Sequence, residues 1–453
     1  MMQTDTHLLW SAVTCHRFGR AGLLARTPAL RVMRGGGATS HAVKSGDKSP
    51  HSIKMRAHIV TVLFFCAFAG VVPAQVITFP GVPAEPAPVV HLPVARAPAQ
   101  GETQAQVQPG TLAQSLPQVR ARLDLAWPTP NGAFMEGRGI EAFIQPTVSG
   151  VVESGLFGGT RKDGMRFHEG IDLKPLLRDE DGEAADPVFA VLPGVVRYIN
   201  FIPGNSDYGR YVVIEHTGVA PAVYSLYAHL GAVQDGLRAG DFVGRGQRIG
   251  TMGRSSGTMS LPKAQAHLHF ELGVRMSDNF QAWYDARGLG GKNYHGLFNG
   301  YNLMGFDPLD FFAKWRAGAV GDFQAYFAQM QQAVRVRVVT GAVPDFVRRH
   351  PSLLTRPLPA GGGAGGGGGA GDGGGGGGAL GGWEIACNPT GLPFAWTPLT
   401  VAEVAGEKAG GVRVVAYDEG IIRAWRSRSI VIFNRGVAKP GRDLLEVIEM
   451  VFK

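Results

Sequence analysis

The sequence predicts a mainly β protein: an antiparallel β-sheet domain, then a helical extension, then a small C-terminal unit that is β-rich or α+β. The main observation is a series of short runs rich in valine and isoleucine and bounded by glycines, at 194–198, 211–216, 224–230 and 267–273. Short strands at this spacing, with no helical stretch between them, are typical of an antiparallel sheet. Apolar residues near helical spacing predict a helix over 317–334. Strand-like runs predict further strands at 412–417 and 429–433, and 444–451 fits either a strand or a helix.

The composition divides the chain into segments. Its 66 glycines and 29 prolines in 453 residues exceed ordinary usage and indicate linkers. Prolines recur through 75–126, whereas 361–378 holds fifteen glycines in eighteen positions and predicts a flexible coil. We therefore expect a Pro/Ala-rich linker at 75–126, the β domain at 127–312, the helical extension at 313–350, a glycine-rich linker at 351–382 and a C-terminal unit of unknown role at 383–453.

A secretory signal peptide is predicted at 55–74. Arg56 precedes an apolar run at 59–72, and small residues close the segment at Ala74. The run is too short to span a bilayer, so we expect no integral membrane segment after cleavage and a secreted, periplasmic or cell-envelope location. Residues 1–54 lie upstream of a signal that should be N-terminal. We expect translation to begin at Met55, the alternative being an arginine-rich organelle transit peptide.

Charge and cysteine content exclude two classes of interaction. Of the net charge of +8, +7 arises before residue 75, because the rest of the chain holds 35 basic and 34 acidic residues. Long-range attraction to a polyphosphate is weak for such a balance, so we expect no nucleic-acid partner. Removal of the leading segments removes Cys15 and Cys66 and leaves only Cys387, so no intrachain disulfide can form. The oligomeric state is not indicated by the sequence.

Three local patterns hold candidate metal and proton-transfer residues. His168 and Asp172 are four residues apart with a glycine between them, and the strand-like run 224–230 carries His229 near its end. The third pattern alternates over 267–272, so in a strand His267 and His269 face one side about 7 Å apart. Each pattern alone fits a capped loop or a hydrogen-bonded pair. Their occurrence in one β domain predicts a metal site.

Zinc suits these residue types. It accepts neutral histidine nitrogen and aspartate oxygen in a tetrahedron, and a catalytic zinc keeps one position open for water. Two histidines and one aspartate would leave a single positive charge on Zn²⁺, which helps lower the pKa of the bound water toward about 7. The sequence thus predicts a zinc site that activates water.

The stretch 154–273 resembles the lysostaphin/LytM-type zinc metallopeptidases, which are peptidoglycan endopeptidases with the duplicated-hybrid-motif fold. Their hallmarks are His-x-x-x-Asp and His-x-His, with another histidine at the end of an intervening strand. The flanking sequence is similar as well, at 154–158, 187–190, 194–196, 211–216 and 244–250. The resemblance implies that His168, Asp172 and His269 bind Zn²⁺. It also implies that His229 and His267 are an unliganded catalytic pair that handles protons and steadies the oxyanion.

Two further residues and two inserted loops are expected near the predicted zinc site. Glu271 faces the same side as His269 and is expected to orient a ligand, whereas His216 is expected to be a hydrogen-bonded residue at a strand end. Insertions relative to the family lie at 258–266 and at 177–186, the second rich in Asp and Glu. Each should form a loop near the site, so substrate preference does not transfer from relatives. The acidic loop is expected to be solvated, with a calcium site as the alternative.

The expected function is that of an exported zinc-dependent endopeptidase that hydrolyses peptide cross-links in bacterial peptidoglycan. The alternative is a catalytically silent wall-binding or regulatory module that activates other wall hydrolases. A third possibility places the function in the C-terminal unit, with the peptidase domain as a wall-targeting adapter. The glycine tract cannot transmit a rigid geometry, so the unit from Trp383 onward is expected to act as a tethered partner outside the catalytic groove.

Overall fold

The computed structural model describes residues 122–147, 149–257, 259–289, 291–359 and 378–453. The predicted upstream extension, the signal peptide, most of the Pro/Ala-rich linker and nearly all of the glycine tract lie outside these residues. The expectations for those segments stay predictions.

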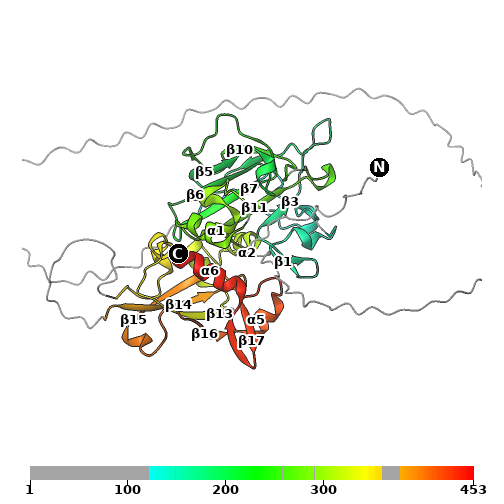
Figure 1. Ribbon diagram of the computed structural model, residues 1–453. Coiled ribbons are helices and arrows are strands. Elements are labelled where there is room, and N and C mark those ends of the chain that lie inside the picture. Colours follow the sequence, from blue (N-terminus) through cyan, green and yellow to red (C-terminus); the bar gives the residue numbers. More distant parts are fainter. Residues whose placement is uncertain (1–121, 148, 258, 290, 360–377) are drawn as a thin grey trace, which may run out of the picture. The chain divides into compact units, whose positions relative to one another are not determined.

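The predicted antiparallel β domain is confirmed. Its main sheet has seven strands in the order β12-β11-β7-β6-β5-β9, with β3 also paired to β11 (Figure 1). Their bounds are β3 (Ile171–Leu173), β5 (Gly194–Asn200), β6 (Tyr211–His216), β7 (Val223–Ala228), β9 (Phe242–Val243), β11 (Leu268–Arg275) and β12 (Leu303–Phe306). The four runs expected from the sequence correspond to β5, β6, β7 and β11. All these strand pairs are antiparallel.

The β domain also has two smaller sheets, whose strands alternate along the chain with those of the main sheet. One has the order β4-β10-β8, and the other is the hairpin β1-β2. Their bounds are β1 (Gly158–Arg161), β2 (Arg166–His168), β4 (Pro187–Phe189), β8 (Leu230–Val233) and β10 (Arg248–Met252). His229 alone separates β7 from β8, and it has a φ of 59°, in the left-handed region that histidine tolerates better than most residues. This turn moves the chain from the main sheet into the three-stranded sheet.

The helices are short. They are α1 (Phe280–Arg287), α2 (Pro308–Arg316), α3 (Phe323–Ala328), α4 (Asp345–Arg349), α5 (Glu419–Ala424) and α6 (Arg442–Phe452). Helix α2 shows why such short helices begin where they do: Asp307 caps it by accepting from the backbone N–H groups of Leu309 and Asp310, and Pro308 occupies the first turn. Within the described residues, no helix has the length and apolar character needed to cross a membrane.

In the part of the chain that the structure describes, the 3₁₀ turns are η1 (Ile140–Ala142), η2 (Val152–Gly155), η3 (Pro203–Asn205), η4 (Lys263–Gln265), η5 (Gly296–Phe298), η6 (Gly300–Asn302), η7 (Pro351–Leu353) and η8 (Ala402–Val404).

The helix expected over 317–334 is wrong in extent. Only α3 forms within it, and the strand β13 (Val334–Val339) begins at Val334, because its Val-Arg-Val-Arg alternation has the period of a strand with one buried face. β13 lies inside a four-stranded sheet of order β15-β14-β13-β16. The other members are β14 (Leu380–Cys387), β15 (Pro393–Thr400) and β16 (Val412–Tyr417), and a hairpin of β17 (Val431–Asn434) and β18 (Val437–Pro440) follows. The extension and the C-terminal unit therefore share one sheet.

The C-terminal unit also packs on the β domain, which contradicts the expectation of a merely tethered partner. One continuous apolar cluster includes Phe270 of β11, Trp396 of β15 and Val447 of α6. In addition, the Arg428 Nη2 lies 3.3 Å from the Glu169 Oε1, and both side chains are buried. The α+β character of the unit agrees with the predicted fold class, and the ambiguous stretch 444–451 is helical in α6.

Candidate metal centre

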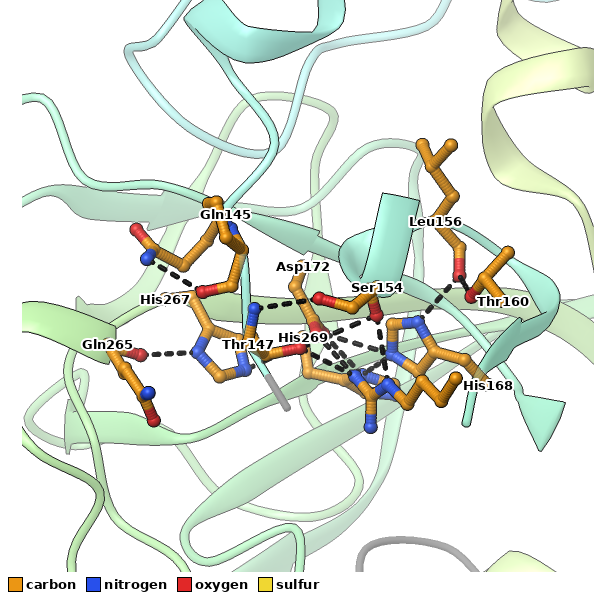
Figure 2. Close-up of polar contacts among 12 residues, drawn as sticks. Gln145, Thr147, Ser154, Leu156, Thr160, His168, Asp172, Gln265, His267 and His269 are labelled. Carbon is orange, nitrogen blue, oxygen red and sulfur yellow. Dashed lines mark hydrogen bonds and ion pairs between the residues drawn. The ribbon is translucent and has the colours of Figure 1, made fainter. Parts of the chain in front are cut away.

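Three side chains from three strands converge on one point. His168 ends β2, Asp172 lies in β3 and His269 lies in β11. The Asp172 Oδ1 is 3.0 Å from the His168 Nε2 and 3.0 Å from the His269 Nδ1, and the two nitrogens are 3.0 Å apart (Figure 2). All three side chains are buried. The structure thus brings together the three residues that the sequence singled out as metal ligands.

Strand pairing explains this convergence. Antiparallel pairing of β3 with β11 sets Asp172 directly opposite His269. Gly170, between His168 and Asp172, permits the close approach: a Cβ at this position would lie 2.3 Å from the Phe270 backbone oxygen. The glycine in the His-x-x-x-Asp pattern is therefore required by the packing of the chain against β11.

The hydrogen bonds of the outer ring nitrogens fix the tautomers. The His168 Nδ1 donates to the Leu156 carbonyl oxygen at 2.8 Å, and the His269 Nε2 donates to the Glu271 Oε1 at 2.9 Å. Glu271 is held in turn by the hydroxyls of Tyr208 and Tyr224, at 2.6 and 2.9 Å. In the neutral imidazoles, the nitrogens that face each other and Asp172 therefore carry lone pairs.

Three electron-pair donors this close together fit a bound cation. Zinc forms bonds of about 2.0–2.2 Å to histidine nitrogen and carboxylate oxygen, and donors 3.0 Å apart can be reached from one point at that distance. Within the described ranges, no other group of three or more His, Cys, Asp or Glu residues is close enough to share a metal. This includes the described acidic loop at 177–186, for which calcium binding was the alternative.

The electrostatics of the cluster also call for one positive charge. Burial, together with the nearby Arg161, lowers the pKa of His168 to about 4. Burial acts in the same direction on His269, but its hydrogen bonds to Asp172 and Glu271 outweigh burial and raise its pKa to about 9. Without a metal, a proton on His269 fills the role of the cation, so metal binding must displace it.

Two residues that bind Asp172, Arg161 and Thr147, were not predicted from the sequence. Its Oδ2 accepts from the Arg161 Nη2 at 2.6 Å and from the Thr147 hydroxyl at 3.1 Å. Burial opposes ionisation of Asp172, yet His168, His267 and Arg161 together hold its pKa well below the usual range. Asp172 is therefore a carboxylate. No local motif marks Arg161 or Thr147, because neither lies within ten residues of Asp172.

His229 and His267 lie beside this cluster. Their ring centroids are 4.7 Å apart, and the His267 Nε2 is 3.5 Å from the Asp172 Oδ1. The Nδ1 of each donates to a backbone carbonyl, of Ser255 for His229 at 2.8 Å and of Gln265 for His267 at 2.6 Å. Each Nε2 is thus left as an acceptor.

Both of these imidazoles are neutral bases. Burial lowers the pKa of His229 well below its ordinary value, and the neighbouring His267 and His269 add to this. Burial also lowers the pKa of His267, although Asp172 opposes it. A neutral imidazole beside a metal site can accept a proton from bound water.

The two remaining sequence assignments can be placed. Glu271 contacts His269 as expected. His216 lies at the end of β6, where its ring nitrogens bond the Pro193 carbonyl oxygen and the Ser225 hydroxyl at 2.9 and 2.8 Å. These two partners are those expected of a hydrogen-bonded residue at a strand end.

Comparison with known proteins agrees with this geometry. Residues 166–280 match the family model described as peptidase family M23. This segment contains all five of the site residues His168, Asp172, His229, His267 and His269. No curated protein matches the chain.

Several solved structures are similar over part of the chain. A zinc-containing peptidase from Vibrio cholerae is 28% identical over 29% of this chain and 34% of that one, with a TM-score of 0.20. The catalytic domain of a variant of the prophage-encoded M23 protein EnpA from Enterococcus faecalis is 26% identical over 29% and 79% of the two chains, with a TM-score of 0.20. The lysostaphin catalytic domain from Staphylococcus simulans is 19% identical over 38% and 89%, with a TM-score of 0.21.

The chain thus spans only about a third of the length of the Vibrio cholerae structure. The family match rests on the sequence of 166–280, in which the ligand triangle and both neutral histidines lie. The β domain of this chain is thus similar to peptidase family M23 over residues 166–280.

Proposed function

We propose that the protein is a zinc-dependent endopeptidase that hydrolyses peptide cross-links in bacterial peptidoglycan. The observation that carries the proposal is the triangle of lone pairs formed by His168, Asp172 and His269, with edges of 3.0 Å. The match to peptidase family M23 supports peptide hydrolysis. The resemblance to the lysostaphin/LytM-type enzymes supports peptidoglycan as the substrate.

The ligand set would be the His168 Nε2, the Asp172 Oδ1 and the His269 Nδ1. When bound there, zinc would supply a Lewis acid that lowers the pKa of a water molecule and polarises the scissile carbonyl. Arg161 and Thr147 hold the second oxygen of Asp172, so the first stays directed at the two nitrogens. Glu271 fixes the ring orientation of His269.

His229 and His267 would move the protons of the reaction. Each presents an Nε2 lone pair because its Nδ1–H is held by a backbone carbonyl. One imidazole accepts the proton of the attacking water and, once charged, can give it to the leaving amine. Before it gives up this proton, the imidazolium so formed can donate a hydrogen bond to the oxyanion of the tetrahedral intermediate. Their burial excludes the bulk water that would compete for these bonds.

Export of the protein belongs to the same proposal. Peptidoglycan lies outside the cytoplasmic membrane, and the signal peptide predicted at 55–74 would deliver the chain there. N-terminal sequencing of the mature protein from the cell envelope or medium tests this: a start near residue 75 supports export, and an intact Met55 contradicts it.

Digestion of purified sacculi tests the function. The zinc-loaded protein should release muropeptides whose new termini identify a cleaved peptide bond, and a chelator should stop the release. Binding to sacculi without any cleavage would favour the alternative of a catalytically silent wall-binding or regulatory module. Cleavage that persists after complete zinc removal would contradict the metal mechanism.

A further inference from the structure

The two segments expected to be insertions relative to the family are joined to each other by Glu183. This residue belongs to the acidic loop 177–186, and its carboxylate accepts from the Arg254 Nε at 2.7 Å and from the Arg254 Nη2 at 2.9 Å. The Lys263 Nζ of the second insertion lies 3.4 Å from the same carboxylate. The hydrogen bonds from Arg254 lower the pKa of Glu183 to about 2, so the carboxylate is ionised.

Further hydrogen bonds link the same segments. The Lys263 Nζ donates to the Asp181 carbonyl oxygen at 2.6 Å, and the Arg178 Nη1 donates to the Lys263 carbonyl oxygen at 3.0 Å. The Arg254 Nη1 donates to the Leu261 carbonyl oxygen at 2.8 Å. The acidic loop, Arg254 and the second insertion therefore form one connected network, which we term the insertion clamp (residues 177–186, 254 and 259–266).

The insertion clamp adjoins the backbone carbonyl groups that accept hydrogen bonds from His229 and His267. Arg254 stands between Gly253, whose carbonyl accepts from the His267 backbone N–H at 3.2 Å, and Ser255, whose carbonyl accepts from the His229 Nδ1. Gln265, which accepts from the His267 Nδ1, ends the turn η4 that begins at Lys263. Each Nδ1 acceptor is thus within two residues of a side chain that contacts Glu183.

We propose that Glu183 is a positioning residue for His229 and His267, acting by holding Arg254 and Lys263 and through them the carbonyl groups of Ser255 and Gln265. The inference rests on the proposed function for its catalytic consequence. Proton transfer requires each Nε2 to point at the reacting atoms, and that direction is set by the Nδ1–H bond on the opposite side of the ring. Glu183 itself touches neither substrate nor metal.

A role in folding stability alone would give a different result. Glu183 and Arg254 are about one-third exposed, with side-chain accessibilities of 32% and 29%, and an ion pair so exposed adds little to stability. Loss of the pair should therefore leave the fold and the zinc ligands intact while loosening the two backbone acceptors.

The experiment compares Glu183→Ala and Glu183→Gln with the wild-type protein. The matched control is Glu403→Ala, because Glu403 accepts two hydrogen bonds from Arg356 and also has its pKa lowered to about 2, but lies in η8 of the C-terminal unit. We expect Glu183→Ala to keep about one zinc and its melting temperature, and to lose roughly 10-fold to 100-fold in kcat with KM little changed. Glu183→Gln can still accept from Arg254 and should recover part of the loss, and the control should match wild type.

A second readout needs no substrate. Long-range ¹H–¹⁵N spectra of the zinc-loaded protein should show His229 and His267 as Nδ1–H tautomers, and in Glu183→Ala the signal of His267 should broaden or shift toward a tautomer mixture. Unchanged spectra and kcat, loss of zinc, or a rise in KM alone would overturn the inference. If the wild-type protein cleaves no peptidoglycan, the proposed function fails, and the spectra still decide whether Glu183 positions the histidines.

Discussion

The His168 Nε2 and the His269 Nδ1 face each other at 3.0 Å, although the residues are 101 positions apart in the sequence. The outer nitrogen of each ring already donates, to the Leu156 carbonyl in one case and to Glu271 in the other. Two inward lone pairs next to the Asp172 carboxylate repel one another unless a cation lies between them. This relationship is the physical basis for the metal assignment.

Removal of one ligand should abolish metal binding. We expect His269→Ala and His168→Ala to fall from about one zinc per chain to near zero, with loss of activity, because two remaining ligands do not hold a catalytic zinc. Metal analysis of the dialysed proteins measures this. His216→Gln serves as the control, since His216 is equally buried but bonds Pro193 and Ser225. Full zinc occupancy in a triple substitution of His168, Asp172 and His269 would refute the ligand set.

Substitution of an unliganded histidine should separate chemistry from metal binding. His229→Ala and His267→Ala are expected to retain zinc and to lose roughly 10²–10⁴ in kcat, since each removes a group that transfers a proton or steadies the oxyanion. Metal analysis checks that zinc is retained, and steady-state kinetics on the same preparations measure the loss in kcat. Loss of zinc in His267→Ala would mean that the histidines of the His-x-His pattern are assigned in the wrong order.

The C-terminal unit should be needed for stability of the β domain. Arg428→Ala leaves Glu169 buried without this charge partner, and we expect a loss of about 3 kcal/mol in the free energy of unfolding. Arg423→Ala is the control, because Arg423 pairs with Glu419 on an exposed face of α5. Denaturant titration measures both. Equal stability of the two variants would show that the contact between Arg428 and Glu169 is not formed in solution.

Truncation extends the same prediction. Ending the chain near residue 359 removes β14, β15 and β16 and leaves β13 unpaired beside the exposed apolar face of the domain. We expect the truncated chain to aggregate or to unfold at a much lower temperature. A truncated protein that is as stable as the full chain and binds zinc normally would instead support a tethered, independent unit.

Acid should destabilise the protein through His216. Burial lowers its pKa from 6.5 to about 4, so the fold holds it neutral while the unfolded chain binds a proton below pH 6.5. Its contribution is complete above pH 6.5 and is lost as the pH falls toward 4, which amounts to about 2 kcal/mol at pH 5. Between pH 7.5 and pH 5.0 the free energy of unfolding falls in the wild-type protein. In His216→Gln this fall should be smaller by about 2 kcal/mol. An identical pH dependence would show that His216 is not the group responsible.

Much of the β domain could be predicted from local patterns. Period-two alternation in β11 places His269 and Glu271 on one face, and their hydrogen bond confirms it. The partners of Asp172 could not be predicted, because Arg161 and Thr147 meet it only through the tertiary fold. The same holds for Arg428 and Glu169, which are 259 residues apart.

The sequence pattern of β13 could have corrected the helix predicted over 317–334. The Val-Arg-Val-Arg alternation of β13 has the strand period, but its amphipathic neighbour α3 extended the predicted helix across it. The glycine tract then suggested an independent unit, whereas β14 returns after the tract to pair with β13. A long connection is compatible with such pairing, because loop-closure entropy grows only slowly with loop length.

Anomalous scattering at the zinc edge from crystals of the purified mature protein would locate the metal and its ligands. We expect one strong peak about 2.0–2.2 Å from the His168 Nε2, the Asp172 Oδ1 and the His269 Nδ1, with the Nε2 atoms of His229 and His267 outside bonding distance. A peak bonded to His229 or His267, or no peak in crystals of a protein that still cleaves peptidoglycan, would contradict this expectation.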